Sequence, residues 1–60
     1  MEVFTVAELA THLKCSESLI RKLVTNKKIP FFNVGSRILF KKETIDNWVH
    51  QQEINNNNNL

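Results

Sequence analysis

The stretch KCSESLIRKLVTNKKIP, from Lys14 to Pro30, decides how the rest of the chain is interpreted. Ser16 is a good helix N-cap, whereas Pro30 forbids helix and favours an extended residue before it. The apolar residues between them recur at the spacing of one buried helical face, and they are Leu19, Ile20, Leu23 and Val24. We therefore predict a helix from Ser16 to about Asn26, with a left-handed C-cap at Asn26. Its other side is polar and basic.

A helix is also predicted directly before this stretch. Thr5 and Glu8 have the Thr-x-x-Glu spacing of a capping box. The apolar residues that follow recur at i, i+3, i+4 and i+7, and they are Val6, Leu9, Ala10 and Leu13. This pattern predicts a helix from about Val6 to Lys14. Because the turn to the next helix is so short, the two helices should cross at a steep angle, with the small Ala10 at the crossing, as in a helix-turn-helix.

Downstream, the segment FFNVGSRILF, from Phe31 to Phe40, has two short apolar runs around the only glycine, which is typical of a β-hairpin. A two-residue loop would pair Val34 with Arg37 and scatter the apolar side chains over both faces of the hairpin. A three-residue loop would pair Val34 with Ile38 and gather them on one face. Because a buried face fixes the register, we favour the three-residue loop, which directs Leu39 outward.

A third helix is predicted from about Lys42 to Gln52. Its apolar stripe consists of Ile45, Trp48 and Val49. We expect Trp48 to close the core against the hairpin and the first helix. The asparagine run after this helix has no periodicity, so we expect one domain over residues 1–54 and a disordered tail over residues 55–60. The fold class predicted is mainly α with a small β-hairpin, in the winged helix-turn-helix order of helix, helix, hairpin, helix.

Charge is concentrated in the middle of the chain. All eight basic residues lie between Lys14 and Lys42, and the only acid among them is Glu17, so this segment carries a net charge of +7 although the whole chain carries +2. The five other acids lie outside it. A basic segment with acidic flanks indicates a polyanionic partner, most often a nucleic acid. A solvated basic surface without a partner is the competing interpretation.

Composition argues against several other classes of protein. A single cysteine allows neither an internal disulfide nor a thiolate cluster for zinc, which fits a reducing, cytoplasmic setting. We find no signal peptide, and no apolar run approaches the roughly 18 residues of a membrane span. His12, Cys15 and His50 are the only candidates for a neutral-pH nucleophile, base or soft metal ligand, and no spacing links them. We therefore expect no enzyme, no metal, no cofactor and no small-molecule ligand.

The polar side of the Ser16–Asn26 helix is the first candidate binding surface. In a helix-turn-helix, the N-terminal part of the second helix enters the major groove of DNA. There an arginine can bind guanine with two hydrogen bonds, and a serine or threonine can contact a base or a phosphate. Glu17 would either accept from a cytosine amino group or stabilise the helix N-terminus by its charge. The candidate residues on this side are Ser16, Glu17, Ser18, Arg21, Lys22 and Thr25.

The hairpin offers a second candidate surface, because a basic-tipped hairpin after a helix-turn-helix is a wing. Arg37, beside Ser36 at the tip, would reach a minor groove or a phosphate, unless it is only an exposed turn residue. Four lysines bracket the hairpin and suit phosphate neutralisation better than base recognition. They are Lys27, Lys28, Lys41 and Lys42.

The chain from Phe4 to Gln51 resembles the excisionase-type DNA-binding domains, which are relatives of the MerR-type winged helix. The shared features are the opening Phe-Thr-Val-Ala-Glu-Leu-Ala, the Ser-x-x-Leu-Ile-Arg of the second helix, the Ile-Pro before the hairpin, the Val-Gly-Ser-Arg turn, and a closing helix with Ile45 and Trp48. Members usually have Gly where Lys27 stands. The resemblance implies a small, non-enzymatic, sequence-specific DNA-binding protein of phage, transposon or bacterial regulatory origin, acting in the cytoplasm on the nucleoid.

The resemblance also implies which partners to expect. Excisionases bind side by side near an attachment site, bend the DNA and help to recruit an integrase, whereas other members regulate transcription. The residues do not separate these two roles. We expect double-stranded DNA as the partner, together with an integrase or recombinase or further copies of the chain on adjacent repeats. The alternative function is a protein-interaction module that uses the hairpin's edge and the exposed Phe31 and Leu39.

Overall fold

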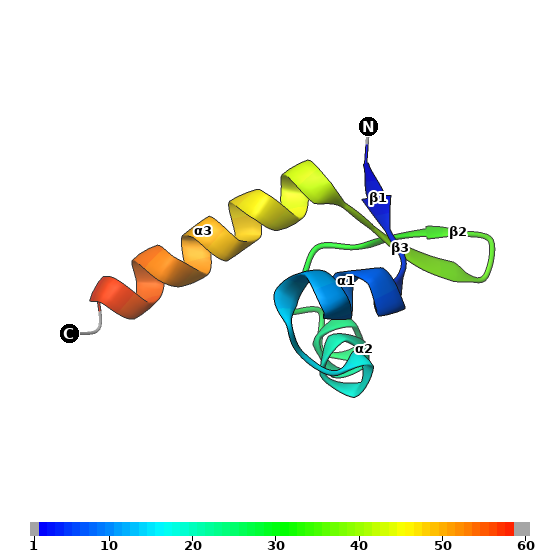
Figure 1. Cartoon of the computed structure of the whole chain (residues 1–60), viewed down its shortest axis with the longest axis horizontal. Coiled ribbons are helices and arrows are strands. Elements are labelled where there is room, and N and C mark those ends of the chain that lie inside the picture. The colour runs from blue at the N-terminus through cyan, green and yellow to red at the C-terminus, as the bar shows by residue number, and fades with distance from the viewer. Residues whose placement is uncertain (1, 59–60) are drawn as a thin grey trace.

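The computed structural model describes the backbone of residues 2–58 and the side chains of residues 2–56. Its elements, in chain order, are β1 (Val3–Phe4), α1 (Val6–Leu13), α2 (Glu17–Thr25), β2 (Phe32–Val34), β3 (Arg37–Lys41) and α3 (Lys42–Asn58). Three helices with a small antiparallel sheet confirm the predicted fold class, with one extra strand at the start. Figure 1 shows α1 between the sheet and α2, while α3 extends away from the hairpin.

Both helices of the helix-turn-helix begin at the predicted caps. The Thr5 hydroxyl accepts from the backbone N–H of Glu8 at 3.2 Å, and the Glu8 carboxylate accepts from the backbone N–H of Thr5 at 2.9 Å. The Ser16 hydroxyl accepts from the backbone N–H of Leu19 at 3.1 Å. These bonds satisfy N–H groups that have no partner inside the helix, so the two starts are determined by neighbouring residues alone.

α1 ends in a turn that a left-handed lysine makes possible. Lys14 has φ 58°, and its N–H donates to the carbonyl of Thr11 at 3.2 Å. The N–H of Cys15 donates to the carbonyl of Ala10 at 2.9 Å. This pair of bonds is the Schellman motif, in which a residue with positive φ turns the chain out of the helix. The chain thereby reaches the next N-cap within two residues.

α2 ends in the same motif. Its C-cap is Asn26, near which we predicted the end of the helix, but the left-handed residue is the next one, Lys27. The N–H of Lys27 donates to the carbonyl of Val24 at 3.0 Å, and the N–H of Lys28 donates to the carbonyl of Leu23 at 2.8 Å. This pattern requires the positive φ at Lys27, which is 55°. Asn26 has φ −86°, so the prediction of a left-handed C-cap at Asn26 is wrong.

The sheet has three strands in the order β1-β3-β2, with β3 at its centre. β1 pairs with β3 through Val3 opposite Lys41 and Phe4 opposite Phe40. The backbone N–H of Lys42 also donates to the carbonyl of Glu2 at 3.0 Å. A two-residue strand has no alternating pattern to reveal it, which is why the sequence did not predict β1.

The hairpin has a two-residue loop, so the favoured three-residue loop is wrong. The observed pairs are Val34 with Arg37, Asn33 with Ile38, and Phe32 with Leu39. Gly35 has φ 62°, as a glycine at the first loop position of a two-residue hairpin can have at no steric cost. The backbone twist of such turns matches that of the strands, and this preference outweighed the gathering of apolar side chains on one face.

This register leaves apolar side chains on the open face of the sheet. Along β3, Phe40 is fully buried and Ile38 packs against the core. On the other face, Phe32 is 40% exposed and Val34 is 56% exposed. Leu39 lies opposite Phe32 on this outer face, as we predicted for its direction, but it is half-buried.

The core lies where the helices meet the inner face of the sheet. Its buried residues are Leu9, Ala10, Ile20, Val24, Ile29, Phe40 and Ile45. Ala10 is buried, as we expected of a small residue at the crossing of α1 and α2. The predicted buried stripe of α2 is wrong at Leu19, which is 45% exposed. That side chain therefore belongs to the polar side of α2.

α3 is longer than predicted. It runs to Asn58 rather than ending near Gln52, because neither proline nor glycine interrupts it. Residues 55–58 are helical, so the expected disordered tail is wrong for them, and residues 59–60 lie outside the described residues. Within the described part of the chain, no helix is long and apolar enough to cross a membrane.

Two residues hold the first half of α3 against the domain. Ile45 is fully buried in the core. Trp48 is half-buried, packs against the core, and donates from Nε1 to the backbone carbonyl of Lys28 at 3.0 Å. That bond connects α3 to the segment that follows α2, so Trp48 also fixes the exit of the second helix.

Candidate nucleic-acid interface

The exposed side of α2 carries all the polar residues that the sequence placed there. Ile20 and Val24 are buried against the core, which leaves the opposite side of the helix in solvent. The exposed polar residues are Ser16, Glu17, Ser18, Arg21, Lys22 and Thr25. Leu19 adds an apolar side chain to this surface. Sequence reasoning missed it because its position also fits the edge of the apolar stripe.

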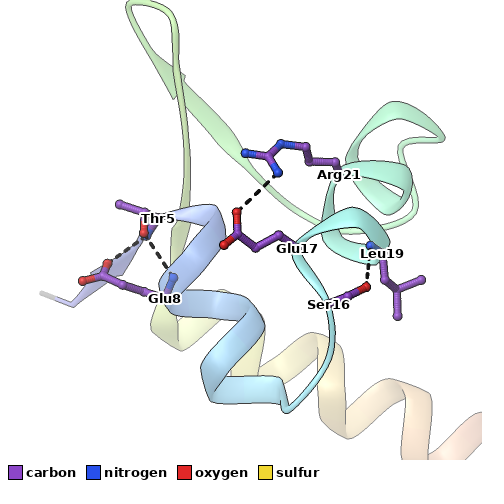
Figure 2. Close-up of polar contacts among 6 residues, drawn as sticks. All are labelled: Thr5, Glu8, Ser16, Glu17, Leu19 and Arg21. Atoms are coloured by element: carbon purple, nitrogen blue, oxygen red, sulfur yellow. Dashed lines mark hydrogen bonds and ion pairs between the residues drawn. The ribbon is translucent and has the colours of Figure 1, made fainter.

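Glu17 and Arg21 form an ion pair on this surface. Nη1 of Arg21 lies 3.3 Å from Oε1 of Glu17, one helical turn away, and Figure 2 shows the two side chains pointing toward each other. The side chains are 50% exposed for Glu17 and 61% exposed for Arg21, so the pair adds little stability. Only one nitrogen of the guanidinium takes part, so its other N–H donors stay available.

This pair gives Glu17 a third role beyond the two that the sequence suggested. Glu17 lies in the first turn of α2, where its charge favours the helix N-terminus. The same carboxylate also restricts where the Arg21 guanidinium lies. The i, i+4 spacing of an acid and a base on a helix is the sequence signal that could have revealed the pair.

Ser16 is engaged in the local structure of α2. Its hydroxyl oxygen accepts from the backbone N–H of Leu19, and Figure 2 shows that bond at the start of the helix. The hydroxyl proton remains available to an external acceptor such as a phosphate oxygen. Ser16 is therefore first a cap, and it can be a contact only through that proton.

The hairpin tip is open to solvent. Ser36 and Arg37 are both exposed, and a Cβ added at Gly35 would meet no atom within 4 Å. Arg37 is the first residue of β3 and lies opposite Val34, so it emerges on the outer face of the sheet. The tip thus presents one guanidinium on a short, narrow projection.

The structure divides the four lysines that bracket the hairpin. Lys27 and Lys28 are exposed directly after α2, and the backbone of Lys28 is held by bonds at both its N–H and its carbonyl. Lys41 and Lys42 lie at the junction of β3 and α3, which Figure 1 shows on the other side of α1 from α2. The first two lysines therefore extend the surface of α2, and the last two do not.

The junction of β3 and α3 is also an acidic neighbourhood. A shallow hollow of about 450 Å³ is lined by Glu2, Lys41, Lys42, Glu43 and Asp46. Nζ of Lys42 lies 2.9 Å from Oδ2 of Asp46. The hydrogen bond and the charge of Asp46 raise the pKa of Lys42 above its usual value.

The candidate nucleophile, bases and metal ligands do not form a site, and they are His12, Cys15 and His50. Cys15 packs against the core, and the ring of His12 stacks on Phe4 with a centroid distance of 4.8 Å. His50 is exposed on α3. Among the residues that the structure describes, no group of three or more His, Cys, Asp or Glu side chains could hold a metal ion.

The chain matches a known protein family. A family model described as a helix-turn-helix domain matches residues 3–53, which spans every element from β1 to the larger part of α3. No curated protein matches the chain. No solved structure matches it either.

Proposed function

Since the chain belongs to the helix-turn-helix domain family, we propose that it binds double-stranded DNA sequence-specifically, with the exposed side of α2 in the major groove. The β2–β3 hairpin serves as a wing on the adjacent minor groove or the phosphate backbone. Helix-turn-helix domains are typically non-catalytic, which agrees with the expectation that this protein is not an enzyme.

The observation that carries this proposal is the exposed surface of α2. Its polar residues stand together on the one side of the helix that the core does not use, and they lie in a chain segment with a net charge of +7. The major groove of B-DNA is about 12 Å wide and admits one α-helix. Positive charge on the same side favours approach to the phosphates.

Base recognition is assigned chiefly to Arg21. A guanidinium can bind O6 and N7 of guanine with two hydrogen bonds, and the ion pair with Glu17 limits its freedom before it binds. Glu17 also places a negative charge near the phosphates, so it weakens binding wherever Arg21 finds no guanine. Leu19 adds an apolar contact suited to a thymine methyl group.

Phosphate contacts are assigned to the remaining exposed residues near α2 and at the wing tip. They are Ser16, Ser18, Lys22, Thr25, Lys27, Lys28, Ser36 and Arg37, of which Arg37 also suits a narrow minor groove. We leave Lys41 and Lys42 out of the interface. Lys42 is already paired with Asp46, and both lysines lie at the junction of β3 and α3, on the other side of α1 from α2 (Figure 1).

The experiment that tests this proposal is a titration of ¹⁵N-labelled protein with generic duplex DNA, followed by NMR at low and at moderate salt. We expect shifts at residues 16–28 and 35–37 that fade as salt rises, because phosphate binding releases counterions. Unchanged spectra at low salt would refute DNA binding. Shifts confined to α3 would refute the placement of α2.

Two biological roles fit this binding mode, and the excisionase-type resemblance supports both. In the first, the protein bends DNA beside further copies of itself and recruits an integrase or recombinase. In the second, it regulates transcription. Circular-permutation electrophoresis on a selected site separates them, because strong bending by adjacent copies supports the recombination role. A single bound copy on unbent DNA supports regulation.

A further inference from the structure

The outer face of the sheet carries apolar side chains that neither the core nor the proposed DNA interface uses. Phe32 and Val34 are exposed, and Leu39 lies beside Phe32 on the same face. Lys41 follows two residues later on β3, so its side chain also emerges on this face. We call Phe32, Val34, Leu39 and Lys41 the outer sheet face.

A small pocket lies at the end of this face that is nearest α3. Its volume is about 140 Å³, and it is lined by Pro30, Phe31, Phe32, Lys41 and Thr44. Two aromatic residues and a proline make its walls largely apolar. Lys41 adds a cation, and it forms no ion pair with any residue that the structure describes. An apolar side chain that carries a carboxylate beside it would satisfy both features.

We propose that the outer sheet face binds a partner protein through a short segment in which apolar side chains alternate with carboxylates. The apolar side chains would cover Phe32, Val34 and Leu39 and enter the pocket, and a carboxylate would pair with Lys41. Arg37 on the same face adds a second positive charge at the tip. Glu2, Glu43 and Asp46 also border Lys41, but they precede β1 or belong to α3. The charges on the face itself are those of Lys41 and Arg37, and they favour an acidic segment.

Charge also argues against a second copy of this chain as the occupant. Two copies in contact through the outer sheet face would bring their Lys41 and Arg37 side chains together, and like charges in an interface are costly. β2 is an edge strand of three residues, too short to be a strong template for pairing with another strand. The contact we infer therefore depends on side chains.

The outer sheet face shares only the hairpin tip, through Arg37, with the proposed DNA interface. α1 and the rest of the core pack on the inner face of the sheet, beneath Phe40, and α2 lies beyond α1. A partner on Phe32, Leu39 and Lys41 and DNA on α2 would thus lie on opposite sides of the molecule, and they would approach each other only at Arg37. The inference does not rest on DNA binding, and either can fail alone.

The probe for this test is a capped pentapeptide, Glu-Phe-Glu-Leu-Glu, added to ¹⁵N-labelled protein. We expect amide shifts at residues 30–34 and 39–41. One control peptide has lysine in place of each glutamate, and a second has serine in place of phenylalanine and leucine. Both controls should leave the spectrum unchanged, because each lacks one of the two chemical features that the face requires.

Substitutions in the protein supply the matched comparison. Phe32→Ser and Val34→Ser remove exposed apolar groups, and each should weaken peptide binding about tenfold. Ile54→Ser, at a residue of α3 that is also exposed, should leave peptide binding unchanged. Circular dichroism verifies that each variant is folded.

Three outcomes would overturn the inference. The first is an unchanged spectrum at millimolar peptide, and the second is equal binding of the lysine peptide. The third is a set of shifts at Phe32, Val34 and Leu39 on dilution without any peptide, with a dimer in sedimentation, because a second copy would then occupy the face.

Discussion

The surroundings of Arg21 indicate a role in binding. It stands one helical turn from Glu17, exposed, with one nitrogen paired and the others available. Lys42 presents the opposite case, because its ammonium lies 2.9 Å from the Asp46 carboxylate, in a neighbourhood of further acids. A count of basic residues does not distinguish Arg21 from Lys42. Their partners make one a candidate for base recognition and the other a local structural contact.

Arg21→Ala should remove sequence preference more than affinity. Loss of a guanidinium that binds guanine with two hydrogen bonds costs about 1–3 kcal/mol of discrimination at that base pair. Selection from a random duplex pool, followed by competition between the selected and a scrambled site, measures this loss. Arg21→Lys keeps the charge and serves as the control, and it should also lose discrimination. An unaltered selected sequence for the Ala variant would contradict the assignment.

Lys28→Ala and Lys42→Ala should differ in salt dependence. The slope of log affinity against log salt should flatten by about 0.9 for Lys28→Ala, because the variant neutralises one phosphate fewer. It should stay unchanged for Lys42→Ala, because Asp46 already neutralises that charge. Fluorescence anisotropy with a labelled duplex at several salt concentrations gives both slopes. If the salt slope flattened equally in the two variants, Lys42 would also contact a phosphate.

At the scale of elements, α1 and α2 begin and end by similar devices. A hydroxyl caps each start, and a lysine with positive φ closes each Schellman turn, at Lys14 and Lys27. Left-handed backbone costs an L-residue about 1–2 kcal/mol, a cost that glycine avoids. The excisionase-type domains that the chain resembles usually have Gly where Lys27 stands. Lys14 and Lys27 are therefore strained, and the turns they form end α1 and α2.

Lys27→Gly should stabilise the domain. Relief of left-handed strain outweighs the greater entropy of glycine in the unfolded chain, for a net gain of about 0.5–1 kcal/mol. A gain of this size raises the melting temperature of so small a domain by several degrees, at about 4–8 °C per kcal/mol. Thermal unfolding followed by circular dichroism measures it. Lys27→Ala is the matched control and should bring no such gain.

Gly35→Ala, at the hairpin tip, should destabilise the domain. A Cβ there meets no atom within 4 Å, so the only cost is the positive φ of 62°. We expect a loss of about 1–2 kcal/mol in the free energy of unfolding, measured in urea. An unchanged stability would mean that the loop relaxes to another turn.

At the scale of the whole molecule, one small core joins the described elements except β2, whose three residues are exposed. Its buried residues connect both helices of the helix-turn-helix to β3 and to the first turns of α3. Beyond Trp48 and Val49, α3 extends away from the domain, as Figure 1 shows, and its side chains from His50 to Asn56 are exposed. The cooperative unit should therefore end soon after Val49, and the domain boundary at residue 54 stays a prediction.

Truncation after Ile54 should leave stability and DNA affinity unchanged within error, because the side chains of residues 55 and 56 are exposed. Ile45→Ala is the contrasting variant. It removes a fully buried side chain and should cost about 2–5 kcal/mol, enough to unfold much of so small a domain. Melting curves of both proteins test the boundary. Destabilisation by the truncation would show that the end of α3 belongs to the domain.

The sequence by itself determined the parts of this protein that depend on near neighbours. The caps at Thr5 and Ser16, the apolar periodicity of α1 and α2, and the basic middle segment are all properties of residues within a few positions of one another. Short-range spacing is enough to recognise them. Most of the candidate interface on α2 follows from the same patterns, because removing the apolar stripe leaves its polar side.

Only the tertiary structure decided the contacts between residues far apart in the sequence and the register of the hairpin. The pairing of Val3 with Lys41 and the bond from Trp48 to Lys28 connect residues far apart in the sequence. The hairpin register was a choice between two loops, and turn geometry at Gly35 competed there with the burial of side chains. That choice left Phe32 and Val34 exposed. Such contacts depend on which packing of the whole chain has the lowest free energy. A pattern of neighbouring residues does not contain that information.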